Sequence, residues 1–227
     1  MQPIEQQNLS ARAYAALREA LIAGHFGPGQ RLVLHELAQT LGTSVTPVRE
    51  ACLTLVSEKA LEMRLGRSVT VPELSLSRYI EIRSIRIALE GLATELAVNH
   101  ARKSDVANLV RIQKEFRSAN SARDSGIATR LNREFHFGVY RLCGMEMLIR
   151  QIESMWICMG PILKLYHEQM ADAYLDADEH VHIIDALRSQ DGALARKALE
   201  RDLLRGGEGI EKYLEQMQWT EGGKRVG

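Results

Sequence analysis

Apolar residues recur at helical spacing in two consecutive segments on either side of residue 42. The first segment repeats at Leu34, Leu37, Ala38 and Leu41. Gly42 follows, where the end of a helix favours a residue that tolerates a positive φ. The second segment begins around Pro47, which suits the first turn of a helix, and repeats at Val48, Ala51, Cys52 and Leu55. The pattern predicts a helix-turn-helix.

Polar residues of the turn and second helix point outward in this reading. Ser44 or Thr46 is expected to cap the second helix, and Arg49 is placed to bind a DNA phosphate or a guanine. Residues 60–71 alternate in character around a Gly-Arg turn and predict a β-hairpin, and residues 14–22 predict a third helix. The candidate DNA contacts are Thr43, Ser44, Thr46 and Arg49, with Arg64, Gly66 and Arg67 of the hairpin.

Beyond residues 71–75 the alternation ends and a long helical period begins. We therefore predict two domains, 1–74 and 75–227, the second an all-α bundle with helices near 76–99, 106–116, 127–142, 147–170, 177–189 and 193–217. Pro161 is expected to kink the fourth of these. In the first, the apolar face is assigned to Ile82, Ile85, Leu89, Leu92 and Leu96. Arg83, Arg86 and Glu90 are assigned to another face.

Composition changes this picture little. The chain balances 29 Lys+Arg against 29 Asp+Glu, so any surface for DNA must come from the placement of charges rather than from their excess. Three cysteines without CxxC spacing favour free thiols in a reducing compartment. No run of about 18 apolar residues and no basic leader occurs, so we expect a soluble cytoplasmic protein without a membrane partner.

Four polar side chains of the second domain are candidates for a metal site. Asn132 and His136 are four residues apart and share a helical face, while His180 and Asp202 fall on two further helices. Nitrogen and oxygen donors that converge inside a bundle can hold a divalent ion. The spacing also fits buried histidines that hydrogen-bond to polar neighbours, and the pattern leaves both readings open.

The motifs LREALIAGHFGPGQRL and ELAQTLGTSVTPVREACLTL, followed by the hairpin, resemble the DNA-binding domain of GntR-type bacterial transcriptional regulators. The family usually reads Ser-Arg-Thr-Pro-Val-Arg-Glu at the start of the second helix. Val45 stands where the first arginine would be, so one expected DNA contact is absent. The resemblance implies a winged helix-turn-helix that binds a double-stranded DNA operator.

The motifs LNREFHFGVYRLCG and DEHVHIIDAL resemble the ligand-binding (FCD) domain of the FadR-like branch of that family. The resemblance implies an antiparallel bundle of six or seven helices that holds a divalent metal of the Zn, Ni or Mn type. Asn132 takes the place of the usual Asp, His136 and His180 are retained, and Asp202 replaces the last His. RSIRIALEGLATELA places Arg86 where an arginine commonly faces the effector; a salt bridge from Arg86 to Glu90 is the alternative.

Together these features predict a homodimeric regulator, not an enzyme, that binds a palindromic operator and senses a small carboxylate-type metabolite. The effector is expected to contact Arg86, Asn132, His136 and His180. Two alternatives are a bundle that only dimerises and an enzyme in which a bound metal activates water. No nucleophile–base pair or Gly-rich phosphate loop accompanies the histidines, which argues against the enzyme.

Overall fold

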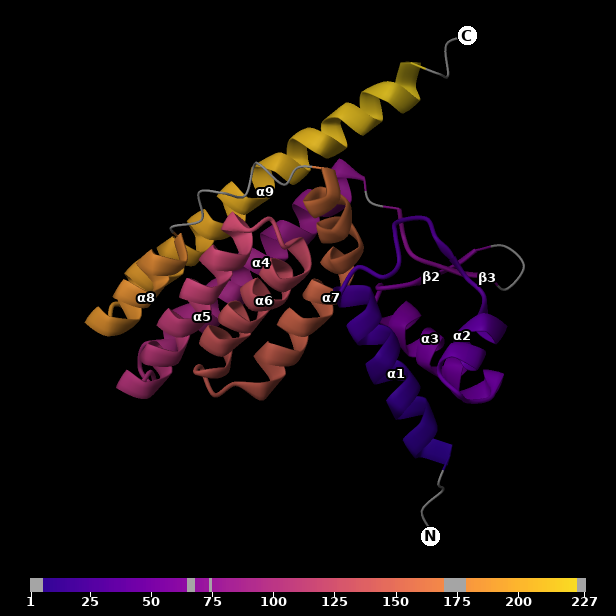
Figure 1. The fold of residues 1–227 in the computed structure, drawn as a ribbon, viewed down its shortest axis with the longest axis horizontal. Coiled ribbons are helices and arrows are strands. Elements are labelled where there is room, and N and C mark those ends of the chain that lie inside the picture. Colours follow the sequence, from indigo (N-terminus) through magenta and orange to yellow (C-terminus); the bar gives the residue numbers. More distant parts are fainter. Residues whose placement is uncertain (1–5, 65–67, 74, 170–178, 224–227) are drawn as a thin grey trace. The chain divides into compact units, whose positions relative to one another are not determined.

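The computed structural model describes residues 6–64, 68–73, 75–169 and 179–223. Contacts divide the chain into two compact units: Met1–Leu74 with Trp156–Leu165, and Ser75–Met155 with Tyr166–Gly227. No helix within the described residues is long and apolar enough to cross a membrane. The two units are described separately below, with the element labels of Figure 1.

The N-terminal unit packs three helices against a small sheet (Figure 1). Its helices are α1 (Gln6–Ile22), α2 (Leu34–Thr40) and α3 (Val45–Ser57). Its strands are β1 (Arg31–Leu32), β2 (Glu62–Arg64) and β3 (Ser68–Thr70), in the antiparallel order β1-β3-β2. The predicted winged helix-turn-helix is confirmed. The two-residue strand β1, which pairs Leu32 with Val69, was not predicted because it is too short to show alternation.

The turn between α2 and α3 has the expected backbone. Gly42 has a φ of 62°, a value that L side chains rarely adopt, and the Pro47 ring is buried in the first turn of α3. Ser44 is the N-cap residue, but its side chain makes no capping hydrogen bond. The predicted capping bond is therefore wrong, and Ser44 contributes only its extended backbone at this position.

Buried side chains of α1, α3 and the sheet form one hydrophobic core. The predicted inner face of α3 is confirmed, since Val48, Ala51, Cys52 and Leu55 are all at most 1% exposed. Burial raises the pKa of the Cys52 thiol to about 11. All three cysteines are free thiols, as their spacing predicted.

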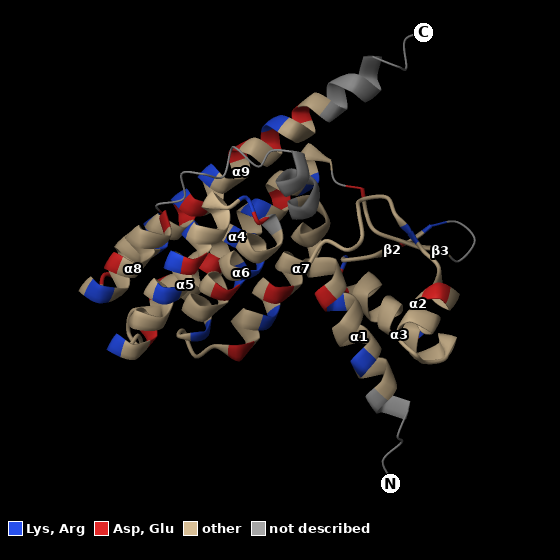
Figure 2. Ribbon diagram, viewed as in Figure 1, with Lys and Arg blue, Asp and Glu red and all other residues tan. Residues whose placement is uncertain are grey.

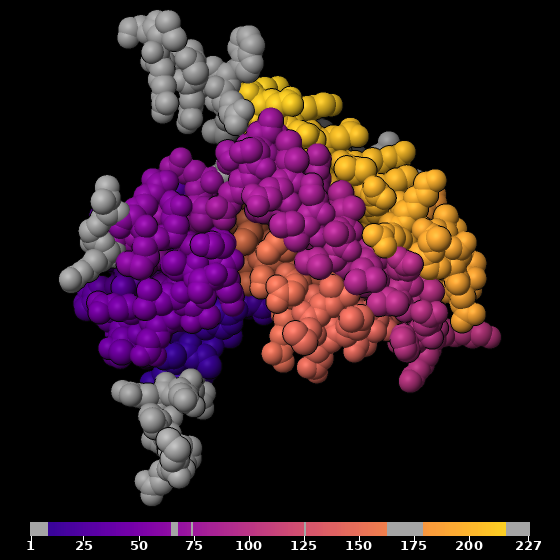
Figure 3. All heavy atoms as spheres, turned by 180° about the vertical axis from the view of Figure 1, so that it is seen from behind, coloured from indigo at the N-terminus to yellow at the C-terminus, as the bar shows by residue number. Residues whose placement is uncertain are grey.

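The C-terminal unit contains only helices in its described residues. They are α4 (Leu76–Ala97), α5 (Lys103–Ser121), α6 (Ser125–Arg141), α7 (Glu146–Gln169), α8 (Glu179–Ser189) and α9 (Gly192–Gly223), with residues 156–165 of α7 grouped with the N-terminal unit. Ser75 caps α4 by accepting a hydrogen bond from the Arg78 amide. Helix α9 packs along α4 and α8, and α5 packs on α6 and α8 (Figure 1). Seen from behind, the yellow residues of α9 lie against the magenta residues of α4 (Figure 3). The predicted all-α bundle is confirmed.

The inner face of α4 differs from the predicted one. Ile85 and Leu92 are 40% and 37% exposed, whereas Arg86 is 8% exposed and Glu90 is fully buried. The inner face was assigned from apolar residues alone, and Arg86 and Glu90, which neutralise each other, were assigned to another face. This correction brings α4 into the candidate site described next.

Candidate functional site

Three of the predicted metal ligands meet inside the C-terminal unit. His136 on α6, His180 on α8 and Asp202 on α9 are all buried, and one donor atom of each lies within 4.8 Å of the others. The two Nε2 atoms are 3.2 Å apart, and Asp202 Oδ2 lies 3.3 Å from His136 Nε2. Asp202 Oδ1 lies 3.8 Å from His180 Nε2. His180 and Asp202 follow His136 by 44 and 66 positions in the sequence. The fold nevertheless brings the three side chains into one small volume.

The Nδ1 atom of each histidine, on the side of the ring away from the cluster, has a hydrogen-bonding partner. Nδ1 of His180 lies 2.6 Å from Gln113 Oε1 on α5, and Nδ1 of His136 lies 3.1 Å from the Tyr140 hydroxyl. The His180 ring also stacks on Phe135, with the ring centroids 4.0 Å apart and the planes 16° apart. These contacts fix both rings with their Nε2 atoms toward Asp202.

Glu179 fixes the first turn of α8, directly before His180. Its carboxylate is almost fully buried and accepts from Arg201 Nε at 3.0 Å and from Arg205 at 2.9 Å, both on α9. His182 Nδ1, at 3.0 Å, is a third neighbour. His182 itself is half-exposed and does not belong to the buried cluster.

The charge state of the cluster follows from its burial. Burial lowers the pKa of His180 to about 3 against the opposing effect of Asp202, so this imidazole is neutral at physiological pH. Burial alone would raise the pKa of Asp202, but His136 and His180 outweigh it and hold that pKa below its ordinary value. The site therefore contains an ionised carboxylate beside a neutral imidazole.

Arg86 and Glu90 form a two-point ion pair on the buried face of α4. Arg86 Nε lies 2.7 Å from Oε1 of Glu90, and an outer nitrogen of Arg86 lies 3.2 Å from Oε2. Burial alone would lower the pKa of Arg86, yet Glu90 raises it, so the guanidinium stays charged. The salt bridge that the sequence left as an alternative is present, and it is buried rather than exposed.

The remaining predicted ligand, Asn132, lies on the same helix as His136. Asn132 is one turn before His136 on α6, and its Oδ1 atom is buried without a hydrogen-bonding partner. Sequence reasoning missed Gln113 and Tyr140. Tyr140 follows His136 by four residues, so a search for polar residues at helical spacing would have found it. Gln113 carries no such signal, because only the fold brings α5 to α8.

The candidate DNA contacts lie on the turn, on α3 and on the hairpin. Ser44, Thr46 and Arg49 are exposed at the start of α3, and Thr43 is half-buried. Arg64 on β2 is half-exposed and forms ion pairs with Glu62 at 2.7 Å and Glu73 at 3.1 Å. Gly66 and Arg67 lie outside the described residues. Figure 2 shows acidic and basic residues interspersed along the helices, in line with the balanced composition.

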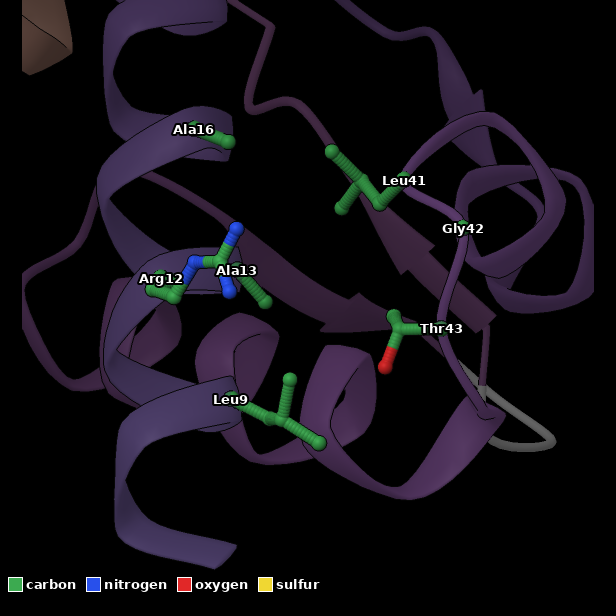
Figure 4. A pocket seen from close by; sticks show the side chains of 7 residues that line it. All are labelled: Leu9, Arg12, Ala13, Ala16, Leu41, Gly42 and Thr43. Carbon is green, nitrogen blue, oxygen red and sulfur yellow. The ribbon is translucent and has the colours of Figure 1, made fainter.

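A small pocket also lies in the N-terminal unit, between α1 and the helix-turn-helix turn (Figure 4). Its volume of about 180 Å³ is below the roughly 300 Å³ at which pockets for drug-sized ligands begin. It is lined by Leu9, Arg12, Ala13, Ala16, Leu41, Gly42 and Thr43. The pocket is thus a small gap in the helix packing, and none of the buried histidines lines it.

A winged helix-turn-helix joined to an all-α domain is the architecture of a DNA-binding transcriptional regulator. Comparison with known proteins agrees: residues 9–71 match the bacterial regulatory proteins of the gntR family, and residues 81–205 match the FCD domain. The chain belongs to the GntR family and carries a C-terminal FCD domain. It is therefore a DNA-binding transcriptional regulator and not an enzyme.

Individual relatives support the same assignment. The chain is 36% identical over 185 residues to the HTH-type transcriptional regulator McbR of Escherichia coli K12, covering 81% of this chain and 84% of McbR. It is 34% identical over 168 residues to a probable D-xylose utilization operon transcriptional repressor of Paenarthrobacter nicotinovorans, covering 72% of each. The solved structure of E. coli McbR/YncC matches with a TM-score of 0.83 at 31% identity, covering 92% of this chain and 98% of that one.

Replacing Glu90 tests the buried ion pair. Glu90→Gln keeps the shape of the side chain but removes the charge that compensates Arg86, so we expect the free energy of unfolding to fall by about 3–5 kcal/mol. The matched control is Glu115→Gln, which breaks the i,i+4 pair of Arg111 and Glu115 on the surface of α5. That variant should lose at most about 0.5 kcal/mol. Urea titration of both variants measures the difference, and equal losses would contradict the assignment.

Proposed function

We propose that this regulator binds its operator as a homodimer and that a small organic acid, bound beside a divalent metal in the C-terminal unit, alters its affinity for DNA. The observation that carries the proposal is the convergence of His136, His180 and Asp202 in the interior of that unit. The similarity to known regulators supports DNA binding, and the buried cluster supports the binding of a metal and a ligand. The following paragraphs take the DNA, the metal and the acid in turn.

The DNA-binding surface is assigned to the exposed start of α3 and to the hairpin. Thr46 and Arg49 are exposed on α3, with Thr43 and Ser44 in the preceding turn. An arginine there can donate two hydrogen bonds to guanine or bind a phosphate. Arg64 would exchange Glu62 and Glu73 for backbone phosphate, and Arg67 and Gly66 complete the predicted wing contact. Two such units in a dimer fit a palindromic operator.

The donor set fits a divalent cation. His180 is neutral, Asp202 is ionised, and the Nε2 atoms and carboxylate oxygens approach one another at 3.2, 3.3 and 3.8 Å. Asn132 Oδ1, buried without a partner, is available as a further oxygen donor. Imidazole and carboxylate donors suit ions of the Zn, Ni or Mn type, so we assign Asn132, His136, His180 and Asp202 as ligands. A bound ion of this kind supplies a Lewis acid that can hold a carboxylate.

Charge balance favours an acid with one carboxylate at the metal. Glu90 compensates Arg86, and Asp202 compensates half of a divalent charge, so these side chains and the ion together would leave one net positive charge. A monocarboxylate would neutralise it. Gln113 Nε2 is buried without a hydrogen-bonding partner and can donate to such a ligand. In this arrangement the metal binds the carboxylate of the acid, which the sequence had assigned to Arg86. Direct contact between Arg86 and the acid stays a prediction.

Binding of the acid can be coupled to binding of DNA through the equilibrium between two conformations of the protein. An acid that binds better to the conformation unable to span two half-sites lowers operator affinity by its differential affinity for the two states. For allosteric pairs this is typically about 1–3 kcal/mol, or about 5–150-fold in affinity. The same coupling, by reciprocity, weakens acid binding when DNA is bound.

Arg49→Ala should weaken binding to the operator. Loss of a specific base contact costs about 1–3 kcal/mol, and loss of a phosphate contact lowers the slope of log affinity against log salt by about one per subunit. Fluorescence anisotropy at several salt concentrations measures both quantities. Arg188→Ala, an exposed arginine on α8, is the control and should bind as the unchanged protein does. Equal affinity of the two variants would remove Arg49 from the interface.

Metal binding can be tested at two histidines that are two residues apart. His180→Ala should abolish stoichiometric metal in the purified protein, whereas His182→Ala should retain it, because only His180 belongs to the cluster. Asn132→Asp should tighten binding, since a carboxylate is a better ligand than an amide. Elemental analysis and calorimetric titration with Zn²⁺, Ni²⁺ and Mn²⁺ measure these effects. Metal retained in His180→Ala at the level of His182→Ala would contradict the site.

Sensing can be tested by gel shift with the metal-loaded protein and a panel of mono- and dicarboxylates. We expect at least one monocarboxylate to change operator affinity by about 5–150-fold. His180→Ala should bind DNA but lose that response. If no acid changes DNA affinity and none raises the melting temperature, the C-terminal unit acts in dimerisation alone.

A further inference from the structure

A chain of buried side chains runs from α4 to the candidate metal cluster on α6. Arg86 pairs with Glu90, Glu90 Oε2 lies 2.5 Å from the Tyr140 hydroxyl, and that hydroxyl lies 3.1 Å from Nδ1 of His136. Every member is at most 8% exposed. Each step lies within hydrogen-bonding distance, so the protons along the chain can be assigned.

Tyr140 has one proton for two neighbours. The Glu90 carboxylate, charged opposite Arg86, can only accept a hydrogen bond, so the hydroxyl donates to Glu90. Burial and then Glu90 raise the pKa of Tyr140 well above its ordinary value, which keeps this proton on the oxygen. The Tyr140 oxygen can then only accept from His136, so Nδ1 of His136 must carry a proton.

The same reasoning holds at His180 with a different partner. The amide oxygen of Gln113 accepts a hydrogen bond, so Nδ1 of His180 carries its proton and donates across the 2.6 Å contact. His180, which is neutral, therefore directs its Nε2 lone pair into the cluster, and Nε2 of His136 lies beside it and beside Asp202. This set of donors favours a cation.

We propose that Glu90 and Tyr140 are positioning residues that hold His136 in its Nδ1–H tautomer, so that its Nε2 atom is available as a ligand. Without Tyr140, His136 is released to carry its proton on Nε2 and to donate it to Asp202 Oδ2, 3.3 Å away. The hydrogen bond from His136 to Asp202 would then occupy two of the donor atoms and compete with a metal. The functional meaning of this role rests on the proposed metal site, but the tautomer belongs to the metal-free protein.

Nitrogen-15 NMR of the full chain, treated with chelator at pH 8, reads the tautomers directly. Long-range proton–nitrogen correlations should show His136 and His180 as Nδ1–H in the unchanged protein. In Tyr140→Phe, His136 should change to the Nε2–H form while His180 stays as it was. The control is Tyr79→Phe, which removes another buried hydroxyl, bonded to the Gly207 carbonyl, and should leave both histidines unchanged.

Calorimetric titration with Zn²⁺ adds a second readout. Loss of the partner that orients a ligand typically weakens metal binding by about 10–100-fold, and we expect this for Tyr140→Phe but not for Tyr79→Phe. An Nε2–H or doubly protonated His136 in the unchanged protein would overturn the positioning role. So would an Nδ1–H His136 that persists in Tyr140→Phe. If the unchanged protein binds no metal, the metal part of the proposed function fails, and the tautomers still decide the positioning role.

Discussion

The C-terminal unit is organised around one constraint, the need to compensate every charge that its helices bury. Arg86 and Glu90 lie on the inner face of α4, where an uncompensated ion would be costly, and they are held to each other by two contacts. Glu90 has accepting capacity left, and it uses this capacity to bind Tyr140. Through Tyr140 the same ion pair reaches His136, so the packing of α4 and the chemistry of the cluster depend on a single carboxylate.

A comparable arrangement orders the other side of the cluster. Glu179 opens α8 and is paired with Arg201 on α9, while the next residues on each helix, His180 and Asp202, face each other inside. Adjacent residues of the two helices thus form one ion pair, with a buried Glu179 and a partly exposed Arg201, and one polar contact between buried side chains. This pairing fixes the register of α8 against α9 and brings together donors from distant parts of the sequence.

The sequence predicted local structure better than it predicted the buried polar network. The helix-turn-helix was recognisable because Gly42, Pro47 and the repeat of α3 act within a few residues of one another. His136, His180 and Asp202 were found from helical spacing and from the resemblance to a family, and the fold brings them together. The inner face of α4 was assigned wrongly, because hydrophobic spacing cannot indicate that an arginine and a glutamate compensate each other in the interior. Gln113 was missed because no pattern in the sequence around it indicates contact with α8.

Burial has a different consequence at Cys52, in the core of the N-terminal unit. Its thiol is closed to solvent, and its raised pKa keeps it protonated, so it offers peroxides and alkylating reagents no thiolate to attack. The sulfur atom fills space between α3 and its neighbours as an aliphatic group would. Cys52 therefore gives oxidants no reactive thiolate within α3.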